Sequence, residues 1–229
     1  MHVIINGVSS ETLQGVQVLS LPPITKPRMR TSVAVIDGRP GDIVTRLGYE
    51  AYNRKIRILL HHDYDIDAIS AFFNTSGTII FSNEPDMEYE FETIDAFSFE
   101  RAVRYKTADI TFHVQPYKLS SSEQPRTGSS SPMTLTNEGN TDSAPRLTIA
   151  GSGTVTVSLD GYLALTITMP STGEITIDSA ELEAYSQGTL ANRSVSGDYN
   201  DIKLSPGQHS LTWTGTVASV TVRNISRWI

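Results

Sequence analysis

Residues 110–115 read Ile110-Thr111-Phe112-His113-Val114-Gln115, and this stretch indicates the class of the fold. Large apolar side chains alternate with more polar ones, so one face of an extended strand would be buried and the other would face water. The same period of two recurs over residues 54–60 and 87–94. A helix would instead need apolar residues every three or four positions. The sequence therefore predicts a mainly β protein.

One segment of the first half departs from this period and predicts a short amphipathic helix. Asp65 is a favourable N-cap and Gly77 suits the end of the helix. The apolar residues at helical spacing are Ile66, Ile69, Phe72 and Phe73. Further strands are predicted over residues 16–21 and 32–36, the second followed by turn formers. We expect residues 1–118 to form a β-sandwich-like domain with one short helix.

The composition changes most visibly over residues 119–132, which read LSSSEQPRTGSSSP. Serine, glycine and proline dominate, and such a segment buries too little apolar surface to offset its ordering entropy. We interpret it as a linker, with a long loop inside one domain as the alternative. Residues 133–229 are then predicted to form an antiparallel β-sandwich. The strands expected there cover residues 154–159, 162–169, 174–177, 210–213 and 217–222, with turns at 151–153 and 160–161.

The composition also narrows the functional classes. The formal net charge of -7 argues against stable nucleic-acid binding, because such binding depends largely on neutralising phosphates. With no cysteine, disulfides and thiolate chemistry are excluded. No apolar run approaches the roughly 20 residues of a spanning helix, so we expect no membrane insertion. The N-terminus does not read as a secretory signal, and we expect the chain to fold in the cytosol.

Motifs for catalysis and metal binding are weak. Residues 63–74 begin like a calcium loop, but Ala68 stands at the sixth position and Asn74 at the twelfth, where glycine and glutamate are needed. A strand end followed by a helix cap explains residues 61–67 better. The chain has neither a Gly-x-Ser-x-Gly elbow nor a Gly-Lys pair. The nearby carboxylates of Asp178, Glu181 and Glu183 show no sign of a glycosidase pair. We expect no enzymatic activity, no metal and no cofactor.

Glu88, Glu90 and Glu92 would share one face of a single strand. They either form a solvated face, partly paired with basic residues across the sheet, or mark an acidic partner surface or channel wall. The sequence leaves both interpretations open. The basic residues considered as partners are Arg57, Arg104 and Lys106.

Trp213 is the candidate for stacking against a glycan. It lies between Leu211 and Gly215 in a predicted strand, where packing in the core is the favoured alternative.

Short motifs in a fixed order along nearly the whole chain suggest a family. The set resembles the distal tail proteins (Dit) of long-tailed phages that infect Gram-positive bacteria. The motifs include Ile5-Asn6-Gly7, Val35-Ile36-Asp37-Gly38-Arg39-Pro40-Gly41, Phe112-His113-Val114-Gln115-Pro116-Tyr117, Asn137-Glu138-Gly139-Asn140, Leu204-Ser205-Pro206-Gly207 and Trp213-Thr214-Gly215.

The resemblance implies that residues 1–118 are a belt domain forming a homohexameric ring, single or stacked. It implies that residues 133–229 are a galectin-like or carbohydrate-module-like sandwich. The ring would join the tail tube protein to the tail-associated lysin or fibre protein of the tip or baseplate, let DNA pass and serve host adsorption. The protein would be assembled in the host bacterial cytoplasm and reside at the virion tail tip.

The alternative is a carbohydrate-binding, lectin-like module with an oligomerising N-terminal domain. Glycan binding by residues 133–229 would distinguish this alternative from the structural role.

Overall fold

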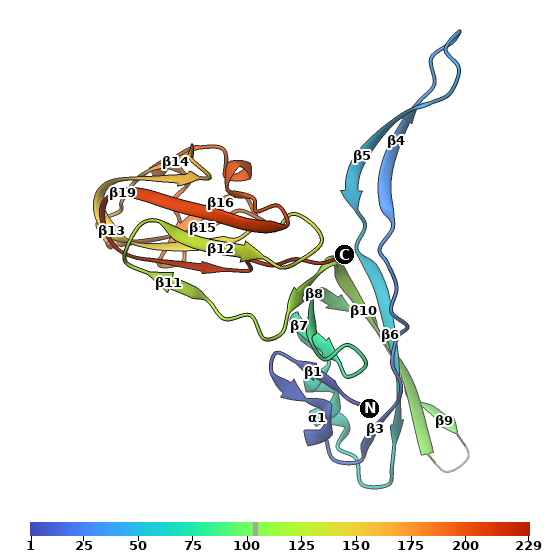
Figure 1. The fold of residues 1–229 in the computed structure, drawn as a ribbon. Coiled ribbons are helices and arrows are strands. Elements are labelled where there is room, and N and C mark those ends of the chain that lie inside the picture. The colour runs from blue at the N-terminus through green and yellow to red at the C-terminus, as the bar shows by residue number, and fades with distance from the viewer. Residues whose placement is uncertain (103–104) are drawn as a thin grey trace. The chain divides into compact units, whose positions relative to one another are not determined.

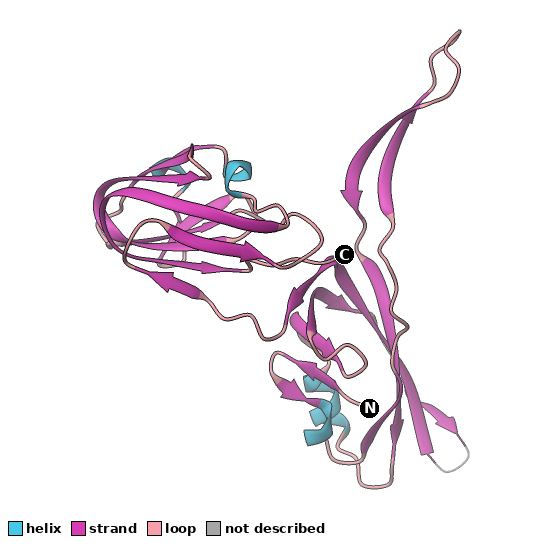
Figure 2. Ribbon diagram, in the orientation of Figure 1, coloured by secondary structure: helices cyan, strands magenta, loops and turns pink. Residues whose placement is uncertain are grey.

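The computed structural model describes residues 1–102 and 105–229, which fall into two compact units. Unit 1 comprises residues 1–121 with Ile229, and unit 2 comprises residues 122–228. Strands dominate both units, as Figure 2 shows, and the described part of the chain contains one short α-helix and three short 3-10 helices. The prediction of a mainly β protein with two β regions is therefore confirmed. No helix among the described residues is long and apolar enough to cross a bilayer.

Unit 1 is built on an antiparallel sheet with the order β2-β1-β7-β8-β10-β6-β3, and β9 pairs with β10. Its elements are β1 (Val3–Ile5), β2 (Val8–Ser9), the 3-10 helix η1 (Ser10–Thr12), β3 (Val16–Ser20), β4 (Met29–Ala34), β5 (Ile43–Tyr49), β6 (Tyr52–Leu60), α1 (Ile66–Phe72), β7 (Gly77–Phe81), β8 (Met87–Ile94), β9 (Glu100–Ala102) and β10 (Tyr105–Ser120). The alternation seen in the sequence buries Ile56, Ile110 and Phe112 in one core.

The helix α1 begins where the sequence predicts but ends earlier. The Asp65 carboxylate accepts hydrogen bonds from the Asp67 N–H (3.0 Å) and the Ala68 N–H (3.2 Å), which makes it the N-cap. The expectation that Gly77 ends the helix is wrong, because α1 stops at Phe72 and Gly77 begins β7. A Cβ at Gly77 would lie 2.1 Å from Asn6 Oδ1, so the glycine admits the Asn6 side chain rather than terminating a helix.

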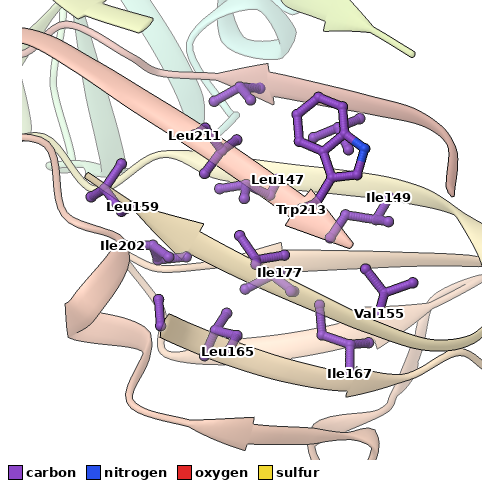
Figure 3. Packing of buried hydrophobic residues seen from close by; sticks show 14 of the residues in the cluster. Leu147, Ile149, Val155, Leu159, Leu165, Ile167, Ile177, Ile202, Leu211 and Trp213 are labelled. Atoms are coloured by element: carbon purple, nitrogen blue, oxygen red, sulfur yellow. The ribbon is translucent and has the colours of Figure 1, made fainter. Parts of the chain in front are cut away.

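Unit 2 is a nine-stranded antiparallel sheet with the path β11-β19-β13-β15-β16-β17, to which β12, β14 and β18 add. Its elements are β11 (Arg126–Gly128), β12 (Met133–Asn137), β13 (Arg146–Leu159), β14 (Tyr162–Thr168), β15 (Glu174–Asp178), β16 (Glu183–Ser186), β17 (Thr189–Leu190), η2 (Asn192–Ser194), β18 (Val195–Gly197), η3 (Tyr199–Ile202) and β19 (Gly207–Arg223). The first half of β13 pairs with β15 and the second half with β14, and side chains from both halves belong to one hydrophobic core (Figure 3).

Two long strands replace shorter ones that the sequence predicts. The predicted turn at residues 151–153 lies inside β13, and the strands expected at 210–213 and 217–222 are one strand, β19. The β13–β19 ladder shifts register on both sides of Gly151 and Ser152. A Cβ on Gly151 would lie 2.4 Å from the Thr216 carbonyl oxygen. The glycine therefore allows the two strands to approach closely at a bulge. The expectation of a turn at this position is wrong.

The segment predicted as a linker, residues 119–132, carries local structure. Its first two residues end β10, the division between the units falls after Ser121, and β11 pairs with β19. The Glu123 carboxylate accepts hydrogen bonds from the Ile225 N–H (2.7 Å) and the Ser226 N–H (2.9 Å). Composition does not reveal these contacts, because a three-residue edge strand needs no apolar side chains.

Candidate assembly site

Strands β4 and β5 form a two-stranded sheet of their own, separate from the eight-stranded sheet of unit 1 (Figure 1). We call residues 26–49 the arm. Every side chain from residue 31 to residue 42 is exposed. Apolar side chains are among them, and Val35 is 75% exposed. The large exposed apolar residues of the arm are Val33, Val35, Ile36, Val44 and Leu47.

Such an arm is incomplete by itself. An isolated two-stranded hairpin is at best marginally stable in water, and neighbouring exposed apolar side chains mark interaction surfaces. Val33 is paired with Val44 in the β4–β5 register, so these two side chains share one face of the hairpin. That face is therefore a candidate contact surface for another protein chain.

The base of the arm is held against the body of unit 1. The Tyr49 ring packs edge-on against the Tyr117 ring, with 6.1 Å between centroids. Lys26 Nζ lies 5.9 Å from the centroid of the Tyr49 ring. The Glu50 N–H donates to the Arg28 carbonyl oxygen at 2.8 Å and closes the hairpin at its base.

A buried ionic cluster lies where the chain enters and leaves the arm. Arg54, the third residue of β6, is 1% exposed, and Glu84 is 8% exposed. The Glu84 carboxylate accepts hydrogen bonds from Arg54 Nη2 (2.8 Å), Tyr89 Oη (2.8 Å) and Lys118 Nζ (3.0 Å). The Arg54 guanidinium also lies 4.6 Å from the centre of the Phe81 ring and 4.4 Å from that of Tyr89.

This cluster fastens the segment that leads into the arm. Arg54 Nη2 donates to the Pro23 carbonyl oxygen at 3.2 Å, and Asn83 Nδ2 donates to the Pro22 carbonyl oxygen at 2.9 Å. Sequence reasoning did not identify the cluster. The sequence does contain one sign of it. Arg54 lies an even number of positions from Ile56, Ile58 and Leu60, so it lies on the same buried face of β6 as they do.

Charge in the cluster is maintained by hydrogen bonding. Burial by itself would raise the pKa of Glu84, but the hydrogen bonds from Tyr89, Lys118 and Arg54 outweigh it and hold that pKa below its ordinary value. Burial raises the pKa of the Tyr89 hydroxyl, so this group remains a proton donor to Glu84. Glu84 therefore stays ionised between the buried Arg54 and the half-buried Lys118.

Formal charge is distributed unevenly along the first half of the sequence. The arm carries a net charge of +3, from five basic and two acidic residues. The remainder of residues 1–117 contains six basic and thirteen acidic residues, a net charge of -7. The charged residues of the arm are Lys26, Arg28, Arg30, Arg39 and Arg46 against Asp37 and Asp42. The arm and the rest of residues 1–117 therefore carry net charges of opposite sign.

The predicted glutamate row lies on β8. Glu90 and Glu92 are exposed and Glu88 is half-buried, whereas Tyr89 and Phe91 between them are buried.

The basic residues proposed as partners of that row have other contacts. Arg57 Nε donates to Asp109 Oδ1 at 2.7 Å, and Lys106 Nζ lies 5.2 Å from the centre of the Tyr64 ring. Arg104 lies outside the described residues. A role for the row as partner surface or channel wall stays a prediction.

Trp213 lies in the core of unit 2, with 8% of its surface exposed. Figure 3 shows it among Leu147, Ile149 and Leu211. Little of the ring is accessible for stacking on a sugar, so its position favours the structural role.

The residues considered for metal or acid–base chemistry have structural contacts. Asp65 caps α1, and the Asp178 carboxylate accepts a hydrogen bond from Arg146 Nε at 2.8 Å. Asp178 also accepts hydrogen bonds from the Ala180 and Glu181 N–H groups in the following turn. Among the described residues, no group of three or more His, Asp or Glu side chains is arranged to hold a metal ion.

Comparison with solved structures shows that this architecture occurs in a phage tail protein. Dit (gp 19.1) of phage SPP1, described as a paradigm of the hub adsorption apparatus in phages infecting Gram-positive bacteria, matches with a TM-score of 0.70. The match covers 100% of this chain and 99% of that one at 14% sequence identity. The chain has the fold of SPP1 Dit. The resemblance inferred from the sequence motifs is thus confirmed for the fold of the whole chain.

Other comparisons are weaker. A chain of the phage P2 baseplate in its activated conformation with Ca matches with a TM-score of 0.48 and 9% identity, covering 95% of this chain and 92% of that one. The same baseplate with Sr matches with a TM-score of 0.49 and 10% identity, covering 93% and 91%. No protein-family model and no curated protein matches the sequence.

Proposed function

We propose that this protein is a structural, non-enzymatic distal tail protein of a long-tailed phage, and that it forms a hexameric ring. The observation that carries the proposal is the full-length match to SPP1 Dit, which includes both units. In this role the ring joins the tail tube protein to the tail-associated lysin or fibre protein of the tip. The protein then resides in the virion at the tail end, after assembly in the host bacterial cytoplasm.

The arm is a second observation in favour of the proposed ring. A closed ring requires a heterologous contact, in which one surface of each copy meets a different surface of the next. The arm offers apolar side chains and a net positive charge, and the rest of residues 1–117 is strongly acidic. We assign the arm as one half of the repeated contact and the acidic body of the neighbouring copy as the other half.

A ring that passes DNA should not retain it. Phosphate binds basic surfaces strongly, so a net acidic opening would repel the passing DNA. The exposed carboxylates on β8 suit such a wall, or alternatively the surface that receives the neighbouring arm. Replacing Glu88, Glu90 and Glu92 by Gln distinguishes these roles. Loss of the ring supports the contact role, and an intact ring that retains DNA supports the wall role.

The mass of the purified full chain in solution tests the ring. Light scattering coupled to size exclusion should give one discrete species of about six times the 25.1 kDa protomer mass. Negative-stain images should show closed rings. A monomer at every concentration, with no ring in the images, contradicts the proposal.

Arm variants test the assigned contact. Val33→Asp with Val44→Asp places charge at two exposed positions, so unit 1 should still fold while the ring is lost. Leu163→Asp, at an exposed position in unit 2, is the matched control and should leave the ring intact. A ring that survives the arm double variant refutes the arm contact but leaves the tail role standing.

A further inference from the structure

Unit 2 contains an open pocket that the proposed tail role does not use. It has a volume of about 680 Å³, within the range of small-molecule sites. The pocket lies beside the β16–β17 hairpin, and η2 and the loop before β15 complete its lining. It is separate in the sequence from the arm and from Trp213.

The pocket is framed by a fixed backbone. Gln187 and Gly188, at the tip of the β16–β17 hairpin, both have positive φ angles (47° and 76°), as a tight two-residue turn requires. The Thr172 and Ser186 hydroxyl oxygens lie 2.7 Å apart, and the Ser186 hydroxyl donates to the Glu174 carbonyl oxygen at 2.7 Å. These contacts tie the hairpin to the loop across the pocket, so the site is formed before any ligand arrives.

Several polar side chains of the lining are available to a ligand. Among the described residues, Gln187, Thr189 and Ser194 make no side-chain hydrogen bond within the chain. They supply one amide and two hydroxyl groups, which both donate and accept hydrogen bonds. Next to them lies an apolar side chain, Leu190, which is 64% exposed. Hydrogen-bonding groups around an apolar patch suit the hydroxyl groups and the CH face of a sugar.

The charge of the lining selects among such ligands. Arg193 is the cation of the lining, and no lining residue carries a carboxylate. Arg193 is exposed and makes no ion pair with any described residue. Unit 2 as a whole is acidic, with six basic residues, Arg193 included, and ten acidic residues. A guanidinium with free donors binds phosphate or carboxylate through charge-assisted hydrogen bonds.

We propose that this pocket binds an anionic, hydroxyl-rich ligand, namely a sugar or polyol that carries a phosphate or carboxylate. Arg193 holds the anionic group, Gln187, Thr189 and Ser194 bind hydroxyls, and Leu190 contacts the CH face. Because the pocket is open to solvent, single ligand units bind weakly, and a repeated array of sites in an oligomer would strengthen binding to a polymer. The proposal concerns unit 2 alone and stands independently of the ring.

Saturation-transfer NMR on the full chain tests this site with D-glucose 6-phosphate as the probe. D-glucose is the matched probe that lacks the charge. Inorganic phosphate lacks the sugar hydroxyls and has no carbon-bound proton, so its binding is measured by how far it displaces glucose 6-phosphate. Glucose 6-phosphate should bind at least about tenfold more tightly than either, since one charge-assisted contact has roughly that worth.

Two variants and a control localise the binding. Arg193→Gln should reduce the affinity for glucose 6-phosphate to that for glucose. Leu190→Ser should weaken the binding of both sugars. Arg223→Gln removes an exposed cation elsewhere in unit 2 and should change nothing. Absence of saturation transfer, or undiminished binding by Arg193→Gln, overturns the proposal. Phosphate binding as tight as that of glucose 6-phosphate overturns the role of the hydroxyl-binding residues.

Discussion

Replacing Glu84 by Gln removes the one carboxylate of the buried cluster below the arm. Arg54 is 1% exposed, so its guanidinium cannot reach water once this carboxylate is gone. Lys118, with 13% of its side chain exposed, also loses its anion. Removing one partner of a buried ion pair costs about 3–5 kcal/mol, because an uncompensated charge remains in the core. We expect Glu84→Gln to lower the free energy of unfolding of unit 1 by about that amount.

Asp109→Asn is the matched control for this substitution. Asp109 also contacts two cations, Arg57 (2.7 Å) and Lys55 (2.6 Å), but these groups lie on the surface. Solvent screens surface pairs, so the control should cost less than about 1 kcal/mol. Adding Arg54→Met to Glu84→Gln removes the unpaired charge and should recover part of the lost stability.

Urea unfolding at one protein concentration measures these differences. Both tryptophans belong to unit 2, so their fluorescence reports that unit, while far-UV circular dichroism reports both units. Glu84→Gln should lower the urea midpoint of the dichroism transition that belongs to unit 1. The tryptophan fluorescence, which reports unit 2, should not show this change. The reasoning is refuted if Glu84→Gln costs no more than Asp109→Asn, or if adding Arg54→Met lowers stability further.

Three further outcomes are expected. Trp213→Ala should destabilise unit 2 by about 3–5 kcal/mol, seen as a lower urea midpoint, whereas unchanged stability with lost glycan binding would favour the lectin-like alternative. Burial lowers the pKa of His209, but hydrogen bonds to the Asp160 carboxylate (2.7 Å) and a backbone carbonyl outweigh it and raise that pKa above its ordinary value. Its stabilising contribution is therefore complete below about pH 6.5 and is lost as pH rises through the raised pKa, a dependence that His209→Gln should abolish in urea titrations. Limited clostripain, which cleaves Arg-Pro bonds as trypsin does not, should cut after Arg39, in the exposed turn of the arm, before it cuts after Arg126, whose backbone is paired in β11. Mass spectrometry of early fragments gives the order, and the reverse order would contradict this account.

Much of the local structure follows from the sequence alone. A period of two over residues 54–60 and 87–94 predicts β6 and β8, because a strand packed on one face must alternate. Asp65 marks the start of α1, since a cap depends only on its own turn. The charge difference between the arm and the rest of residues 1–117 is likewise a property of the sequence. These features depend on neighbours within a few positions or on composition.

Other features were decided by tertiary structure, because they depend on partners that lie far away in the sequence. Gly151 reads as a turn residue, yet the ladder with β19 carries the chain straight through it as a bulge. Arg54 reads as the polar start of a strand, yet Glu84 and two aromatic rings allow it to be buried. The arm is recognisable only because its strands pair with each other and with no strand of the main sheet. Each outcome depends on contacts between residues some 30 or more positions apart, or on their absence, and local pattern carries no information about those contacts.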